Sequence, residues 1–167
     1  DPTDFASQLA TFTQVEQHIK ANTLLEKMVN NAKLSTASLI GKNARIEEKG
    51  YFDGTSIRLT VNPDKGATSA TLIVKNADGK EVAKEKIELP SKTIDWSGKG
   101  TDGKVLDAGV YSFSVESFKD GKSIGENYAE AYSEITEVTF ADKKTLLTLA
   151  GDQTVLLDKI KGLRENS

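Results

Sequence analysis

The sequence contains no cysteine, one histidine, one tryptophan and three prolines among 167 residues. The absence of cysteine excludes disulfides, thiolate metal sites and a cysteine nucleophile. His18 therefore has neither a cysteine nor a second histidine to complete a metal site or a catalytic triad, and we interpret it as a surface residue of a helix. No apolar run approaches the roughly 20 residues that cross a bilayer, so we predict no membrane insertion.

The composition is that of a folded protein. Hydrophobic residues make up 37% and charged residues 28% of the chain, which is too apolar for a disordered segment. The length fits one domain of ordinary size or two small ones. The formal net charge of -3 would repel a phosphate backbone, so we predict no nucleic-acid partner.

Residues 1–34 predict a long helix. Asp1 and Pro2 are typical of a helix start, and neither glycine nor proline occurs between Phe5 and Leu34. Large apolar residues recur at steps of three and four, with Leu24 and Val29 interpreted as continuing the same face, and a break near Asn22 is the alternative. The candidate residues for an oligomer interface are Phe5, Leu9, Phe12, Val15, Ile19, Leu25 and Met28.

After Lys33 the sequence changes to short runs in which apolar and polar residues alternate, separated by glycine, aspartate, asparagine and proline. This pattern predicts antiparallel strands. Asn76–Gly79 and Asp120-Gly121 predict tight hairpin turns, because aspartate and glycine readily supply the positive φ that such turns need. Residues 56–125 therefore form a predicted sandwich.

Trp96 has two interpretations. It follows Ile94 at strand spacing, so packing inside the sandwich is one, and stacking against a ligand is the other. We favour packing, because the domain needs large residues to fill its core. The predicted sandwich core contains Trp96, Tyr111, Phe113 and Val115.

Short strand-like runs also occur on both sides of the predicted sandwich. Neither flank is long enough to fold alone, so the economical arrangement is an insertion, in which residues 35–55 and 126–162 form one β domain around the sandwich of residues 56–125. Glycine and aspartate residues at 50–54 and 120–125 mark the expected flexible junctions.

Carboxylates are numerous, but none predicts a site. The aspartates of the glycine-rich stretch lack the spacing of an EF-hand, and glutamates on strand edges are normally solvated. We expect no catalytic, cofactor-binding or metal-binding residues, and thus no enzyme. The carboxylates considered are Asp95, Asp102 and Asp107 for calcium, and the pairs Glu126 with Glu130 and Glu134 with Glu137 for hydrolysis.

Three motifs carry a resemblance that covers nearly the whole chain. They are Asp4–Gln17, Ser38–Lys42, and Ile94–Gly98 followed by Asp102-Gly103 and Gly109–Phe113. The chain resembles the flagellar hook-capping family, known also as hook assembly scaffold or basal-body rod modification proteins. Ser97 departs from that family, which more often has aspartate there.

The resemblance implies a mostly β fold with an N-terminal helix, in which a fibronectin type III-like (Ig-like) sandwich is inserted into a Tudor-like β-barrel. It also implies a homo-oligomeric cap, exported through the flagellar secretion channel to the tip of the growing hook. The implied partners are other copies, the hook subunit and the distal rod or hook tip. The implied mechanism is binding and confinement of hook subunits, with no cofactor.

Two alternatives stay open at this point. The chain could be a secreted Ig-like adhesion or ligand-binding module with an exposed aromatic platform at Trp96. The apolar face of the helix could pack against the chain's own barrel instead of another copy, because an isolated helix is stabilised mainly by such packing.

Overall fold

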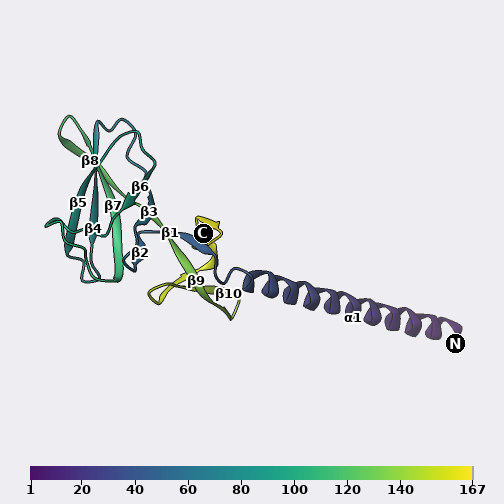
Figure 1. The fold of residues 1–167 in the computed structure, drawn as a ribbon. Coiled ribbons are helices and arrows are strands. Elements are labelled where there is room, and N and C mark those ends of the chain that lie inside the picture. The colour runs from purple at the N-terminus through teal and green to yellow at the C-terminus, as the bar shows by residue number, and fades with distance from the viewer. Residues whose placement is uncertain (167) are drawn as a thin grey trace. The chain divides into compact units, whose positions relative to one another are not determined.

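The computed structural model describes residues 1–166 as one long helix and twelve β-strands (Figure 1). The chain divides into two compact units, residues 1–39 and the residues from 40 onward. The predicted fold class, mostly β with an N-terminal helix, is confirmed.

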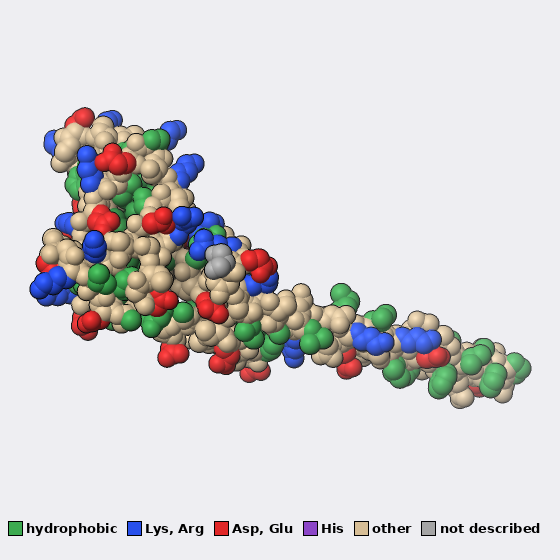
Figure 2. All heavy atoms as spheres, viewed as in Figure 1, with side chains coloured by type: hydrophobic (Ala, Val, Ile, Leu, Met, Phe, Trp, Pro, Cys, Tyr) green, Lys and Arg blue, Asp and Glu red, His purple; other side chains and the backbone are tan. Residues whose placement is uncertain are grey.

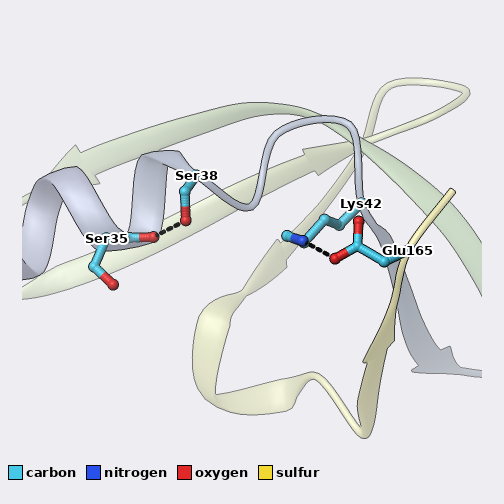
Figure 3. A network of polar contacts seen from close by, with 4 residues as sticks. All are labelled: Ser35, Ser38, Lys42 and Glu165. Atoms are coloured by element: carbon cyan, nitrogen blue, oxygen red, sulfur yellow. Dashed lines mark hydrogen bonds and ion pairs between the residues drawn. The ribbon is translucent and has the colours of Figure 1, made fainter.

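Helix α1 (Pro2–Ala37) begins as its sequence predicts. The Asp1 side chain accepts a hydrogen bond from the Thr3 N–H at 2.9 Å, and Pro2 occupies the first turn. The helix continues three residues beyond the predicted end, because no helix breaker precedes Gly41, whose φ is +87°. At the C-terminal end the Ser38 hydroxyl donates to the Ser35 carbonyl at 2.6 Å (Figure 3).

The apolar residues of α1 lie on two faces, not one. An α-helix turns by about 100° per residue. One side of the helix therefore carries the first stripe, which consists of Phe5, Leu9, Phe12, Val15 and Ile19. The second stripe is Leu24, Leu25, Met28 and Val29, and it lies on roughly the opposite side of the helix. The prediction that these residues continue one face is wrong, because Lys20–Thr23 shifts the phase of the pattern.

Two facing sheets form the sandwich. One is five-stranded, in the order β2-β7-β4-β5 with β8 also paired to β7, and the other contains β6, β3 and the start of β9. The first sheet consists of β2 (Lys49–Phe52), β4 (Ser69–Lys75), β5 (Glu81–Ile87), β7 (Gly109–Lys119) and β8 (Lys122–Tyr128). The facing strands are β3 (Ile57–Thr60), β6 (Thr93–Trp96) and β9 (Glu130–Ala141).

The predicted hairpins are present in the sandwich. In the turn between β4 and β5, the Asn76 side chain accepts from the Asp78 and Lys80 N–H groups, and Gly79 has a φ of +78°. Asp120 and Gly121 both have positive φ between β7 and β8. Both predictions are confirmed, because the requirement for positive φ is local and visible in the sequence.

The long strand β9 continues out of the sandwich into a second group of strands. Their order is β11-β10-β9-β1-β12, all antiparallel, and Ile135, Leu147 and Leu149 are buried among them. Lys42, just before β1, forms an ion pair with Glu165, just after β12 (Figure 3). The bounds are β1 (Asn43–Glu47), β10 (Lys144–Leu149), β11 (Gln153–Leu156), the 3₁₀-helix η1 (Leu157–Lys159) and β12 (Gly162–Arg164).

The chain passes between the sheet that contains β1 and β9 and the five-stranded sheet at Glu48, and it returns at Ala129. These two residues and Phe113 of β7 form a closed ring of backbone hydrogen bonds. The Glu48 N–H donates to the Ala129 carbonyl at 2.8 Å, the Ala129 N–H to Phe113 at 3.0 Å, and the Phe113 N–H to Glu48 at 2.7 Å. We call this the crossing ring.

The crossing ring lies outside the predicted junctions. The predicted boundaries at 55/56 and 125/126 fall within the sandwich, since β2 and β8 both pair with β7. Of the residues that indicated those boundaries, Gly50 and Gly125 lie within β2 and β8, and the others lie in the loop after β2 and in the turn between β7 and β8. Neither Glu48 nor Ala129 is a glycine. Glu48 adopts a φ of +75° there, which is unfavourable for a residue with a side chain.

Substitutions at Glu48 separate its backbone role from its side chain. Glu48→Gly removes the cost of positive φ, so the free energy of unfolding should stay unchanged or rise by up to about 1 kcal/mol. Glu48→Pro removes the N–H donor and cannot adopt positive φ, so it should lower that free energy by at least about 2 kcal/mol. Urea unfolding followed by Trp96 fluorescence measures both. Equal destabilisation by the two substitutions would contradict this account.

Candidate interaction surfaces

Helix α1 presents an exposed apolar surface. It contains no buried residue, and the seven predicted interface residues are each between 51% and 70% exposed. Figure 2 shows apolar side chains at the surface at several places along the helix. Large apolar side chains exposed in this number typically mark a surface that another protein covers. Among residues 1–166, no helix has the length and apolar character needed to cross a membrane.

Trp96 lies at the centre of the sandwich. It is fully buried, and its ring centroid is 5.2 Å from that of Phe113, 5.3 Å from Phe52 and 5.4 Å from Tyr111. Phe113 and Val115 are fully buried too, and Tyr111 is 7% exposed. Trp96 therefore offers no exposed ring on which a ligand could stack.

Tyr111 fixes the loop that precedes β7. Its hydroxyl donates to the Asp107 carbonyl at 2.7 Å, four residues upstream. Burial raises the pKa of the Tyr111 hydroxyl above its usual value, and the Asp107 charge adds to the increase. A tyrosine that bonds back to the chain just before its own strand is a recurring feature of Ig-like sandwiches.

Residues 97–108, between β6 and β7, form a loop that we call the tryptophan loop. Gly98 of this loop lies against the Phe52 ring. Its φ is +76°, and a Cβ atom at this position would overlap the ring. Both the backbone conformation and the close approach therefore require glycine. The sequence shows a glycine after the tryptophan but not the ring that lies against it.

The three aspartates considered for calcium each have a separate role. Asp95 forms a two-pronged ion pair with Arg58, Asp102 accepts from the Lys104 N–H at 3.0 Å, and Asp107 supplies its carbonyl to Tyr111. The hydrogen bond from Arg58 lowers the pKa of Asp95 below its usual value. No group of three or more metal-ligating side chains occurs within residues 1–166.

Three of the four glutamates considered for hydrolysis likewise have separate partners. Glu126 accepts from the Ser114 hydroxyl at 2.6 Å, whereas Glu130 forms an ion pair with Arg45 at 2.8 Å. Glu137 accepts from the Thr139 hydroxyl at 3.0 Å. His18 is exposed on α1.

One further surface was not predicted. The chain has only three arginines among its 22 lysine and arginine residues, and strand register places all three on one side of one sheet. Residues directly opposite each other in an antiparallel pair share a face, as do residues two apart in a strand. We call Arg45, Arg58, Arg164 and Tyr132 the arginine face.

Register connects the members of the arginine face step by step. Arg45 lies opposite Tyr132, and Asn43, two residues before Arg45, lies opposite Arg164. On the other side of β9, Glu130 lies opposite Thr60, which is two residues from Arg58. The arginines alone are visible in the sequence, but their common face depends on pairing between distant strands.

Comparison with known proteins identifies part of the chain. Residues 46–121 match the family model of the FlgD Ig-like domain. This segment is similar to the FlgD Ig-like domain. The matched range contains the tryptophan loop, the Tyr111 hydrogen bond and the core around Trp96, and it confirms the resemblance to the hook-capping family.

Solved structures extend the comparison to the fold. The chain is similar to FlgD from Xanthomonas campestris, with a TM-score of 0.65 and 20% identity over 78% of this chain and 98% of that one. The description of that structure concerns the hook capping essential for flagellar assembly. FlgD from P. aeruginosa gives a TM-score of 0.62 and 20% identity, over 75% and 98% of the two chains. A search of curated proteins gave no match.

A pair of glycine substitutions tests the packing around Trp96. Gly98→Ala should lower the free energy of unfolding by about 1–3 kcal/mol more than Gly103→Ala, because only the first forces a side chain into a packed core. Gly103 has nearly the same φ, +78°, but open space around it. Urea unfolding followed by Trp96 fluorescence gives both values. Equal losses would show that the close contact with Phe52 is unimportant.

Proposed function

We propose that this chain is a structural cap at the distal end of the growing bacterial flagellar hook, where it promotes polymerisation of exported hook subunits. The match of residues 46–121 to the FlgD Ig-like domain is the observation that carries this proposal. The similarity of fold to FlgD from Xanthomonas campestris, whose description concerns hook capping, supports it further. The role needs binding and steric confinement, with no chemical step.

The proposed location follows from the same role. A cap acts where new subunits are added, so the chain would be exported through the flagellar secretion channel and would contact the distal rod or hook tip. The strands β11-β10-β9-β1-β12 would form the Tudor-like barrel of the cap, beside the sandwich.

Self-association of α1 is the second part of the proposal. Fully burying a large apolar side chain contributes about 1.5–3 kcal/mol, and α1 exposes at least seven of them. The first and second stripes lie on roughly opposite sides of the helix, so a single neighbouring helix could cover only one of them. A copy that contacts a different neighbour through each stripe would bury both.

Substitutions in the first stripe test self-association. Phe12→Asp with Ile19→Asp removes two apolar contacts and places charges in their stead, so oligomers should weaken by at least about a hundredfold. Light scattering across a concentration series measures the mass, and circular dichroism checks that the β signal is kept. Ser7→Asp with Gln14→Asp, on the polar side of the same half of the helix, is the matched control. An unchanged oligomer after the first double substitution would refute this role of α1.

Mixing distinguishes two stripes from one. If the first stripe of one copy packs against the second stripe of its neighbour, Leu25→Asp with Met28→Asp should also weaken assembly of this variant alone by at least about a hundredfold. Each variant retains the stripe that the other lacks, so a mixture of the two should form small complexes whereas neither does so alone. A mixture that stays monomeric would mean that both stripes contact the same neighbour, or that α1 packs within its own chain.

A further inference from the structure

Strand β5 is an edge of the five-stranded sheet of the sandwich. It pairs with β4 on one side, and within residues 1–166 no strand pairs with its other side. The tryptophan loop covers only the start of that free side, where the Thr101 N–H donates to the Val82 carbonyl at 3.0 Å. The edge from Lys84 onward has no strand beside it, and a free strand edge can pair with the edge of another chain.

Glu85 occupies the inner face of this edge strand. In an antiparallel pair, residues directly opposite each other share a face, as do residues two apart in one strand. Glu85 lies opposite Leu72, and the residues two positions before and after it are Ala83 and Ile87. All three of these neighbours are buried in the core of the sandwich. A carboxylate therefore stands where the pattern of the strand calls for an apolar side chain.

No contact inside the chain explains a carboxylate at this position. Glu85 is half-buried, and among residues 1–166 its side chain has neither a hydrogen-bond partner nor an ion-pair partner. Burial raises the pKa of the Glu85 carboxyl above its usual value, and no nearby charge opposes that effect. A charge that is partly withdrawn from water without a partner lowers the stability of the fold.

The two neighbours of Glu85 in the sequence add charge to the same edge. Lys84 and Lys86 are exposed, on the opposite face of β5. Exposed lysines and an inward-pointing charge are two of the features by which natural sheets prevent their edges from pairing with other chains. A strand added to β5 would take the remaining water from the Glu85 carboxylate, which would make such pairing unfavourable.

We propose that Glu85 is a guard residue, which prevents β5 from pairing with the same edge of a second copy of this chain. The inference does not rest on the proposed function, because it concerns this edge alone. The charge lowers the stability of the single chain, and it lowers the stability of an edge-to-edge pair further. Association between copies is thereby left to other surfaces, such as the stripes of α1.

Glu85→Val tests the guard residue. All variants also carry Phe12→Asp with Ile19→Asp and are compared with that background, so that the first stripe does not dominate the association. Valine completes the apolar inner face, so the urea concentration at half unfolding, followed by Trp96 fluorescence at low protein concentration, should rise. Light scattering across a concentration series should show an association constant increased by about tenfold or more, because the edge has lost its charge.

Glu116→Val is the matched control. Glu116 is also a half-buried glutamate of the same sheet, but β7 pairs with β4 on one side of it and with β8 on the other. No edge is free there, so the control should leave the association constant unchanged, whatever it does to unfolding. Glu85→Gln removes the charge and keeps a polar side chain, so it should increase association less than valine does.

The inference requires both effects of Glu85→Val together, greater stability and stronger association. If the association constant stays at that of the background, the charge does not guard the edge. If Glu85→Val or Glu85→Gln lowers the urea concentration at half unfolding, Glu85 stabilises β5 and the inference is overturned. Equal association of Glu85→Val and Glu116→Val would also overturn it, because the effect would then come from added apolar surface and not from the edge.

Discussion

The crossing ring of Glu48, Phe113 and Ala129 is the constraint on which the β unit depends. Three backbone hydrogen bonds join Glu48 and Ala129, where the chain passes between the two sheets, to Phe113 of β7. The Phe113 side chain packs against Trp96, so the same residue fixes both the crossing and the core. Buried backbone groups are costly when unpaired, which explains why an unfavourable φ is tolerated at Glu48.

Strand β9 connects the sandwich to the outer strands. Its first residues pair with β3 on one side and β1 on the other, and its later residues pair with β10. The arginine face therefore extends from the sandwich strand β3 to the outer strand β12, held by one register. A shift of one residue in the segment of β9 that pairs with β1, Glu130–Glu134, would turn Tyr132 toward the core and disperse the face.

Local features of the sequence predicted the parts of the fold that depend on local geometry. The start of α1 and the turns at Asn76–Gly79 and Asp120-Gly121 are set by a few neighbouring residues, and the structure has them. The crossings were missed because glutamate and alanine give no sign of a special conformation. The second stripe was misassigned because apolar residues at steps of three and four look alike whether or not their phase has shifted.

The same reasoning explains why one candidate surface was visible in the sequence and the other was not. The residues of one helix face lie close together in the sequence, so the apolar positions on α1 could be predicted from the sequence alone. The arginine face joins strands β1, β3, β9 and β12, whose order follows from pairing and not from sequence. The two surfaces also differ in chemistry, since α1 exposes large apolar side chains, whereas the arginine face carries charges of both signs, with Asp95 opposite Arg58 and Glu130 paired with Arg45.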